Sequence, residues 1–97
     1  MKTKRTGPTR AVWKQVIYPN SVKDKECLIE VPAPVGAKPL RVMEQNGSVC
    51  VWFECDPDAK MGVLNLYCVG TGFGKVCEDR DYLDTVIDGD YVWHFYH

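Results

Sequence analysis

The dipeptide Asn46-Gly47 is the strongest local structural signal in this sequence. Asparagine and glycine both tolerate the positive φ angles that the two central positions of a type I′ turn require. The flanking runs, LRVMEQ at 40–45 and SVCVWFEC at 48–55, are rich in β-forming residues. The sequence therefore predicts a β-hairpin over residues 40–55.

Further short runs of β-branched and aromatic residues repeat this alternation of strand and turn. They lie at 11–18, 26–31, 63–69, 82–87 and 91–96. Residues 32–39 hold three prolines and a glycine, which excludes a helix there. No segment keeps an apolar period of 3.6 residues over about ten positions, so the pattern allows at most one short helix, near residues 76–83. We expect a mainly β fold, a small antiparallel sandwich or barrel of about seven short strands.

The composition indicates one globular domain. The chain has 97 residues, of which 45% are hydrophobic and 26% are charged. Residues 1–14 carry five lysines or arginines and no acid, and we interpret residues 1–10 as a flexible basic arm before a single β domain at 11–97. Residues 78–90 carry six acids against one arginine, which we interpret as a solvated acidic surface.

Charge and cysteine content narrow the classes of partner and compartment. A formal net charge of −1 argues against bulk attraction to long nucleic acids or anionic membranes. Five cysteines without a C-x-x-C spacing, beside only two histidines, support neither a zinc site nor a disulfide framework. The N-terminus lacks the apolar segment of a signal peptide, and no apolar run approaches the roughly 18–20 residues that cross a bilayer. We expect a reduced, cytosolic protein.

The stretch YCVGTGFGKVCED, residues 67–79, places three glycines before a lysine. It lacks the Lys-Ser/Thr end of a Walker A loop and the G-x-G-x-x-G spacing of a dinucleotide-binding turn. Backbone N–H groups near Gly70 and Gly72, with Thr71 and Lys75, could nevertheless meet a phosphate. The other interpretation is a loop that only turns the chain.

The sequence gives little support to catalysis. Ser21 and Ser48 lie in turns without the context of a nucleophile elbow, and both histidines, His94 and His97, lie at the C-terminus. The spacing of the acids at 78–90 does not match a calcium-binding EF-hand loop. We predict a protein that is not an enzyme and has no cofactor and no metal ion.

Aromatic side chains next to cations point instead to ligand binding. Strand alternation places Lys14 and Tyr18 on one face of the first strand and Trp13 on the other. In the last strand, one face must belong to the core, and the other then exposes an aromatic or histidine stripe that favours oligomerisation or base stacking. The two faces are Tyr91, Trp93 and Phe95, and Val92, His94 and Tyr96.

The order of several motifs resembles a family of small phage proteins without an assigned activity. These motifs are WKQVIYP, IEVP, PLRVMEQNGSVCVWFECDP, YCVGTG and VWHFY, and the resemblance covers residues 12–97. Small β-rich phage proteins of this size include nucleotide sponges. These are oligomeric proteins that sequester the cyclic oligonucleotides or cyclic ADP-ribose derivatives of bacterial immune systems such as CBASS and Thoeris.

The resemblance implies an immune-evasion protein in the cytoplasm of the host bacterium. It would bind its ligand without hydrolysing it, in pockets between the subunits of a homo-oligomer. Aromatic rings would stack on the bases, and cations with backbone donors would meet the phosphates. The expected ligand contacts are Trp13, Lys14, Tyr18, Arg41, Thr71, Phe73, Lys75 and Trp93.

Two other classes of function fit the sequence. One is a protein-binding module that inhibits a host protein, for example by adding a strand to a sheet. The other is a small nucleotide hydrolase that depends on His94 or on an acid between Asp79 and Asp90.

Overall fold

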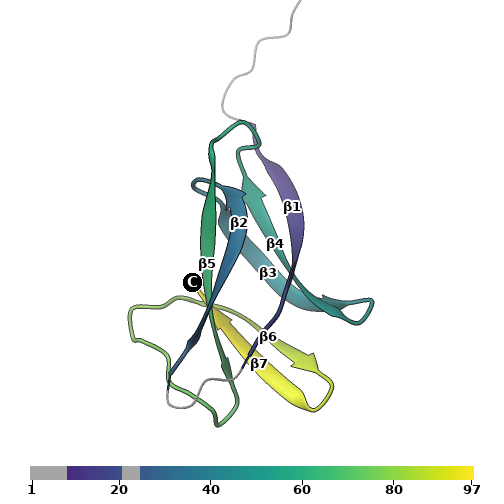
Figure 1. Cartoon of the computed structure of the whole chain (residues 1–97), viewed down its shortest axis with the longest axis vertical. Helices are drawn as coiled ribbons and strands as arrows, with labels where there is room; N and C mark the ends of the chain where they lie inside the picture. Colours follow the sequence, from purple (N-terminus) through teal and green to yellow (C-terminus); the bar gives the residue numbers. More distant parts are fainter. Residues whose placement is uncertain (1–8, 21–24) are drawn as a thin grey trace, which may run out of the picture.

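Two antiparallel sheets make up the structure, a computed structural model that describes residues 9–20 and 25–97. One sheet has the strand order β1-β4-β3 and the other β2-β5-β7-β6 (Figure 1). The bounds are β1 Ala11–Ile17, β2 Cys27–Pro34, β3 Lys38–Gln45, β4 Ser48–Cys55, β5 Met61–Gly70, β6 Tyr82–Asp88 and β7 Tyr91–Tyr96. These seven strands of the described residues confirm the mainly β prediction, and the two separate sheets identify a sandwich and not a closed barrel.

No helix is present in the described ranges, and so none there is long and apolar enough to cross a membrane. The helical turn considered near residues 76–83 is a β-turn, in which the N–H of Arg80 donates to the carbonyl oxygen of Cys77 over 3.1 Å. The predicted basic arm at residues 1–10 lies outside the described residues except for Thr9 and Arg10.

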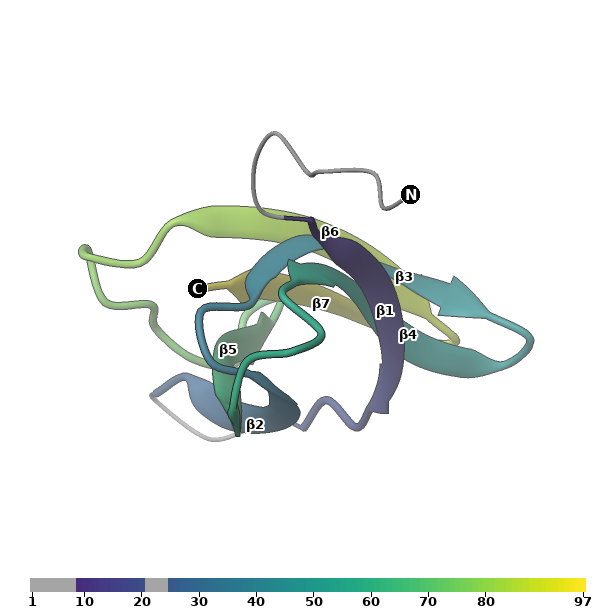
Figure 2. The same ribbon diagram turned by 90° about the horizontal axis from the view of Figure 1, so that it is seen from above.

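The core forms where the inner faces of the two sheets meet. Val51 and Phe53 of β4 pack with Leu66 of β5 and Phe95 of β7, and all four are almost fully buried. Their neighbours along each strand point to the outside, as strand alternation requires. Viewed from above, β6 of one sheet runs beside β3 of the other, and β1 and β2 lie farther apart (Figure 2).

The hairpin predicted at Asn46-Gly47 is confirmed. Asn46 and Gly47 have φ angles of 53° and 85°, as a type I′ turn requires, and Gln45 pairs with Ser48 on either side of them. The side chain of Glu44 accepts a hydrogen bond from the N–H of Gly47 at 2.9 Å. This turn fixes the register of β3 against β4, and therefore which β4 side chains face the core.

Strand β2 continues through Pro32 to Pro34, beyond the strand predicted at 26–31. A proline has no N–H to donate, so it is tolerated only where that position faces away from the neighbouring strand. The N–H of Val35 donates to the carbonyl oxygen of Lys60 at 2.8 Å, so the odd-numbered residues of this segment direct their N–H groups towards β5. Pro32 and Pro34 therefore face the free edge of the sheet, where they interrupt no ladder.

A single carboxylate joins the two sheets along the line where β3 meets β6. Asp84 accepts a hydrogen bond from the N–H of Val42 at 3.0 Å, and the Nε of Arg41 lies 3.6 Å from the same carboxylate oxygen. Both strands have an irregular register beside this contact, between Pro39 and Arg41 in β3 and between Tyr82 and Asp84 in β6. The acidic stretch at 78–90 is thus not a uniformly solvated surface, because one of its carboxylates is a partly buried link.

Replacing this carboxylate tests the link. Asp84→Ala leaves the N–H of Val42 without its partner, and we expect a loss of about 1–3 kcal/mol in the free energy of unfolding. Urea denaturation followed by tryptophan fluorescence measures this change. Asp90→Ala, at an exposed position of the same acidic stretch, serves as the control with a change within about 0.5 kcal/mol. Equal stabilities of the two variants would contradict the link.

Burial raises the pKa of the Cys68 thiol from 9.0 to about 11. The folded protein therefore keeps this proton between pH 9 and 11, where the unfolded chain loses it, so the stabilisation is complete below pH 9 and is lost as the pH rises. We expect the stability advantage of the wild type over Cys68→Ala to shrink by about 2 kcal/mol between pH 8 and pH 10.5. Denaturation of both proteins under reducing conditions measures the difference, and a difference independent of pH would refute the prediction.

Candidate functional site

The outer face of the β1-β4-β3 sheet carries a row of one tryptophan between two cations. Trp52 of β4 pairs with Lys14 of β1 on one side and with Arg41 of β3 on the other. Directly paired residues of antiparallel strands point to the same face. Val51 and Phe53 point into the core, so Trp52 points outward. We call Lys14, Trp52 and Arg41 the cation–tryptophan row.

Hydrogen bonds and ion pairs hold both cations of the row in place. The Nζ of Lys14 lies 5.9 Å from the centroid of the Trp52 ring and donates to the Oε1 of Gln45 at 2.6 Å. Arg41 is oriented by Asp84, yet its side chain remains 67% exposed. A partly exposed indole flanked by two accessible cations provides a stacking surface with positive charge on both sides. This arrangement suits a planar ring that carries anionic groups.

The row contains two of the predicted contact residues and one that the prediction missed. Lys14 and Arg41 are far apart in the sequence, and the register of β4 brings them together. Trp52 was overlooked, although alternation in SVCVWFEC places it opposite to the apolar residues around it. This alternation is the signal that would have identified it.

The four predicted aromatic contacts lie elsewhere, three of them on or next to β1 and β7. Trp13 is on the inner face of β1, where its ring meets Phe53 edge-on with centroids 6.3 Å apart. Tyr18 follows β1 and is 82% exposed. Trp93 is only 5% exposed, belongs to the core and stacks on Tyr91 with centroids 5.2 Å apart. We therefore reassign Trp93 from ligand contact to core residue.

The glycine loop after β5 is docked onto its neighbours through its own backbone. The N–H of Thr71 donates to the carbonyl oxygen of Val92 at 3.1 Å, and the N–H of Phe73 donates to that of Gly70 at 3.0 Å. Two of the donors that a phosphate would need are thus already used within the chain. Phe73 and Lys75 remain exposed there, in a loop at the lower end of the molecule and apart from the β1-β4-β3 sheet (Figure 1).

His94 takes part in a chain of hydrogen bonds across the outer face of β7 and β6. Its Nε2 lies 2.7 Å from the hydroxyl of Thr71 and its Nδ1 lies 3.0 Å from the hydroxyl of Thr85. The Thr85 hydroxyl is also 2.6 Å from the hydroxyl of Tyr82. Both ring nitrogens are therefore engaged in hydrogen bonds with threonine hydroxyls of the same chain.

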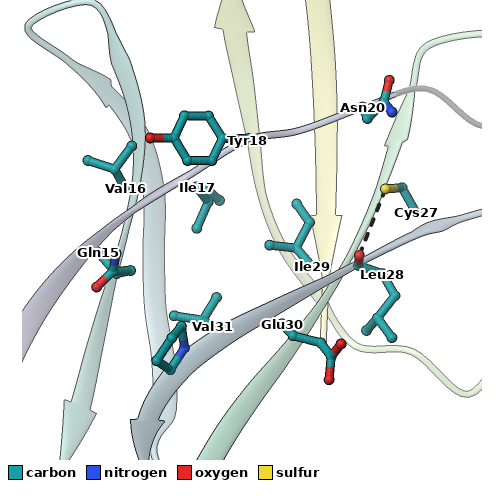
Figure 3. A pocket seen from close by; sticks show the side chains of 11 residues that line it. Gln15, Val16, Ile17, Tyr18, Asn20, Cys27, Leu28, Ile29, Glu30 and Val31 are labelled. Atoms are coloured by element: carbon teal, nitrogen blue, oxygen red, sulfur yellow. Dashed lines mark hydrogen bonds between the residues drawn. The ribbon is translucent and has the colours of Figure 1, made fainter.

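A groove of about 440 Å³ separates β1 from β2. Ile17 of β1 points into it, with Ile29 and Val31 of β2 on the other side (Figure 3). Tyr18 and Gln15 stand on the β1 side of the opening. The floor is apolar, and among the described residues no cation lines the groove. An anionic ligand is therefore better matched by the cation–tryptophan row than by this groove.

Comparison with known proteins identifies a family for this chain but no activity. The family model described as Domain of unknown function (DUF7352) matches residues 8–97. No curated protein and no solved structure matches the chain.

The glycine loop permits a test that is independent of any ligand. A Cβ atom at Gly74 would lie 2.5 Å from the carbonyl oxygen of Lys25, so Gly74→Ala must displace the backbone. We expect it to lower the free energy of unfolding by about 1–3 kcal/mol. Gly62→Ala is the matched control, because the nearest atom there is a methyl group of the exposed Val35 side chain, which can move. A Gly74→Ala variant as stable as the wild type would show that the loop is not docked in this way.

Proposed function

We propose that this chain, which belongs to the DUF7352 family, is a binding protein that sequesters a cyclic nucleotide-type ligand without hydrolysing it. In this proposal one base of the ligand stacks on Trp52, and Lys14 and Arg41 meet its phosphates. The single observation that carries the proposal is the register that places both cations beside the same outward-facing indole.

The physical chemistry of the row supports a nucleotide over other small ligands. Stacking of a base on an aromatic ring is sequence-tolerant and contributes about 1–3 kcal/mol. Arginine can offer two parallel N–H donors to a phosphate, while lysine acts as a point charge. Because the net charge of the whole chain is −1, the row concentrates positive charge locally and the protein does not attract long nucleic acids in general.

The biological setting of the proposal follows from the resemblance to small phage proteins. The ligand would be a cyclic oligonucleotide or a cyclic ADP-ribose derivative that serves as an immune signal in the host bacterium. The protein would act in the host cytoplasm as a homo-oligomer and lower the free concentration of that signal. Such a role requires affinity and abundance and needs no catalytic group.

A ligand panel tests the proposal directly. The purified protein is mixed with cyclic dinucleotides, cyclic trinucleotides and cyclic ADP-ribose isomers, and its melting temperature is recorded. A ligand that binds only the native state raises this temperature by mass action. The bound ligand is then recovered after denaturation and analysed by chromatography. We expect a rise in melting temperature with chemically intact ligand. Altered ligand would indicate an enzyme, and no shift with any of them would refute the proposal.

Substitutions in the row locate the binding site. We expect Trp52→Ala to weaken the affinity by about 5- to 150-fold, which corresponds to a lost stacking contribution of about 1–3 kcal/mol. Lys14→Ala and Arg41→Ala should also weaken binding and leave the melting temperature of the free protein nearly unchanged.

The control removes an aromatic ring and a cation from the other predicted position. Phe73→Ala combined with Lys75→Ala changes only exposed side chains of the glycine loop. Isothermal titration calorimetry compares all variants. If the loop variant loses affinity while Trp52→Ala does not, the site is the glycine loop and the assignment to the row is overturned.

A further inference from the structure

The two sheets have four edge strands. In the described part of the chain, three of them carry a feature that limits pairing with a further strand. β3 and β6 face each other and are joined by Asp84. β2 presents Pro32 and Pro34 to the C-terminal half of its free edge, where prolines prevent the addition of a further strand. β1 has no proline, and no other strand of the described ranges pairs with its second edge.

The geometry of the hairpin shows which residues of β1 direct their backbone groups outward. A two-residue type I′ hairpin closes with a hydrogen-bonded pair, here Gln45 and Ser48, so the even-numbered residues of β4 face β3. The odd-numbered residues of β4 then face β1, where they pair with odd-numbered residues such as Trp13. The N–H and C=O groups of Val12 and Lys14 therefore point away from β4, towards the unpaired edge.

The free part of this edge is the N-terminal half of β1. β2 lies across the groove from residues 15–18, and Ile17 is buried there. At the other end Val12 is 59% exposed and Trp13 39% exposed. A lysine on an edge often protects it. The ammonium group of Lys14, however, reaches across β4 to Gln45 and leaves the edge uncovered.

We propose that this edge pairs with the same edge of a second copy, antiparallel and around a two-fold axis at Trp13. Self-pairing in this register places Trp13 opposite Trp13 of the second copy and Val12 opposite Lys14. Aromatic pairs across strands are favourable, and no like charges lie directly opposite each other. An axis shifted by one residue to Lys14 would place the two Lys14 residues opposite each other and would separate the two Trp13 rings, so the aromatic pair favours the axis at Trp13.

This pairing joins two sheets into one of six strands and brings both cation–tryptophan rows to the same face. Adjacent strands lie about 4.8 Å apart and successive residues about 3.4 Å apart, so the two Trp52 positions are roughly 16 Å from each other. One ligand with two bases can then reach both rows, as expected for a cyclic dinucleotide. The pairing stands without a ligand, and only this last step rests on the proposed function.

A charge exchange at the edge tests the pairing and its register. Val12→Lys places two lysines opposite each other at both symmetric positions, and within one copy residue 12 lies beside Glu54, which tolerates a cation. We expect the dissociation constant of the dimer to rise by at least about tenfold. The double variant Val12→Lys, Lys14→Glu should restore the dimer, because the side chains that face each other at positions 12 and 14 then carry opposite charges. Sedimentation velocity over a range of concentrations measures both.

The matched control is Val63→Lys on β5, which is 55% exposed and lies on a stretch of β5 that pairs only with β2 among the described strands. It should leave the dimer unchanged. The pairing is overturned by a monomeric wild type at all concentrations, by a dimer that Val63→Lys weakens and Val12→Lys does not, or by a double variant that stays monomeric although circular dichroism shows it folded.

These measurements test the proposed dimer and the proposed function independently. A nucleotide that raises the melting temperature of a monomeric wild type supports the row and overturns the pairing. A dimer that binds no member of the nucleotide panel keeps the pairing and overturns the proposed function.

Discussion

The hydrogen bond from the N–H of Val42 to the carboxylate of Asp84 holds together two sheets that share no backbone ladder at this line. The same carboxylate orients Arg41, so one side chain both links β3 to β6 and directs a cation on the outer face. β3 in turn fixes β4 through the hairpin, and β4 fixes β1. The position of every member of the cation–tryptophan row thus follows from contacts that begin at this link.

Local chemistry was enough to predict the strands, and tertiary position decided where the prediction failed. Asn46-Gly47 specifies a turn by its backbone preferences alone, so the hairpin could be predicted from two residues. The extension of β2 through Pro32 and Pro34 could not, because a proline fits a strand only at the edge of a sheet, and the order of strands is not a local property. For the same reason Asp84 could not be distinguished from the exposed acids around it.

The candidate site, too, could be predicted only where local sequence was sufficient. Lys14 and Arg41 were recognisable as candidates, but only the pairing of both with β4 shows that they flank one ring. Trp93 was misassigned because the last strand carries aromatic residues on both faces, and its sequence does not show which face packs against the other sheet. The glycine loop has the composition of a phosphate-binding turn, whereas its function depends on where its N–H groups point. Two of them point to carbonyl groups of the same chain.

The two prolines of β2 also affect the concentration that this protein can reach in a cell without aggregating. A protein that depletes a signal must accumulate to at least the concentration of that signal, and β proteins at high concentration tend to aggregate through free strand edges. The proposed two-fold pairing through β1 uses its open edge in a contact that closes on itself. Pro32 and Pro34 offer no donor at the free edge of β2, so a further copy finds no continuous ladder to extend along this part of the edge.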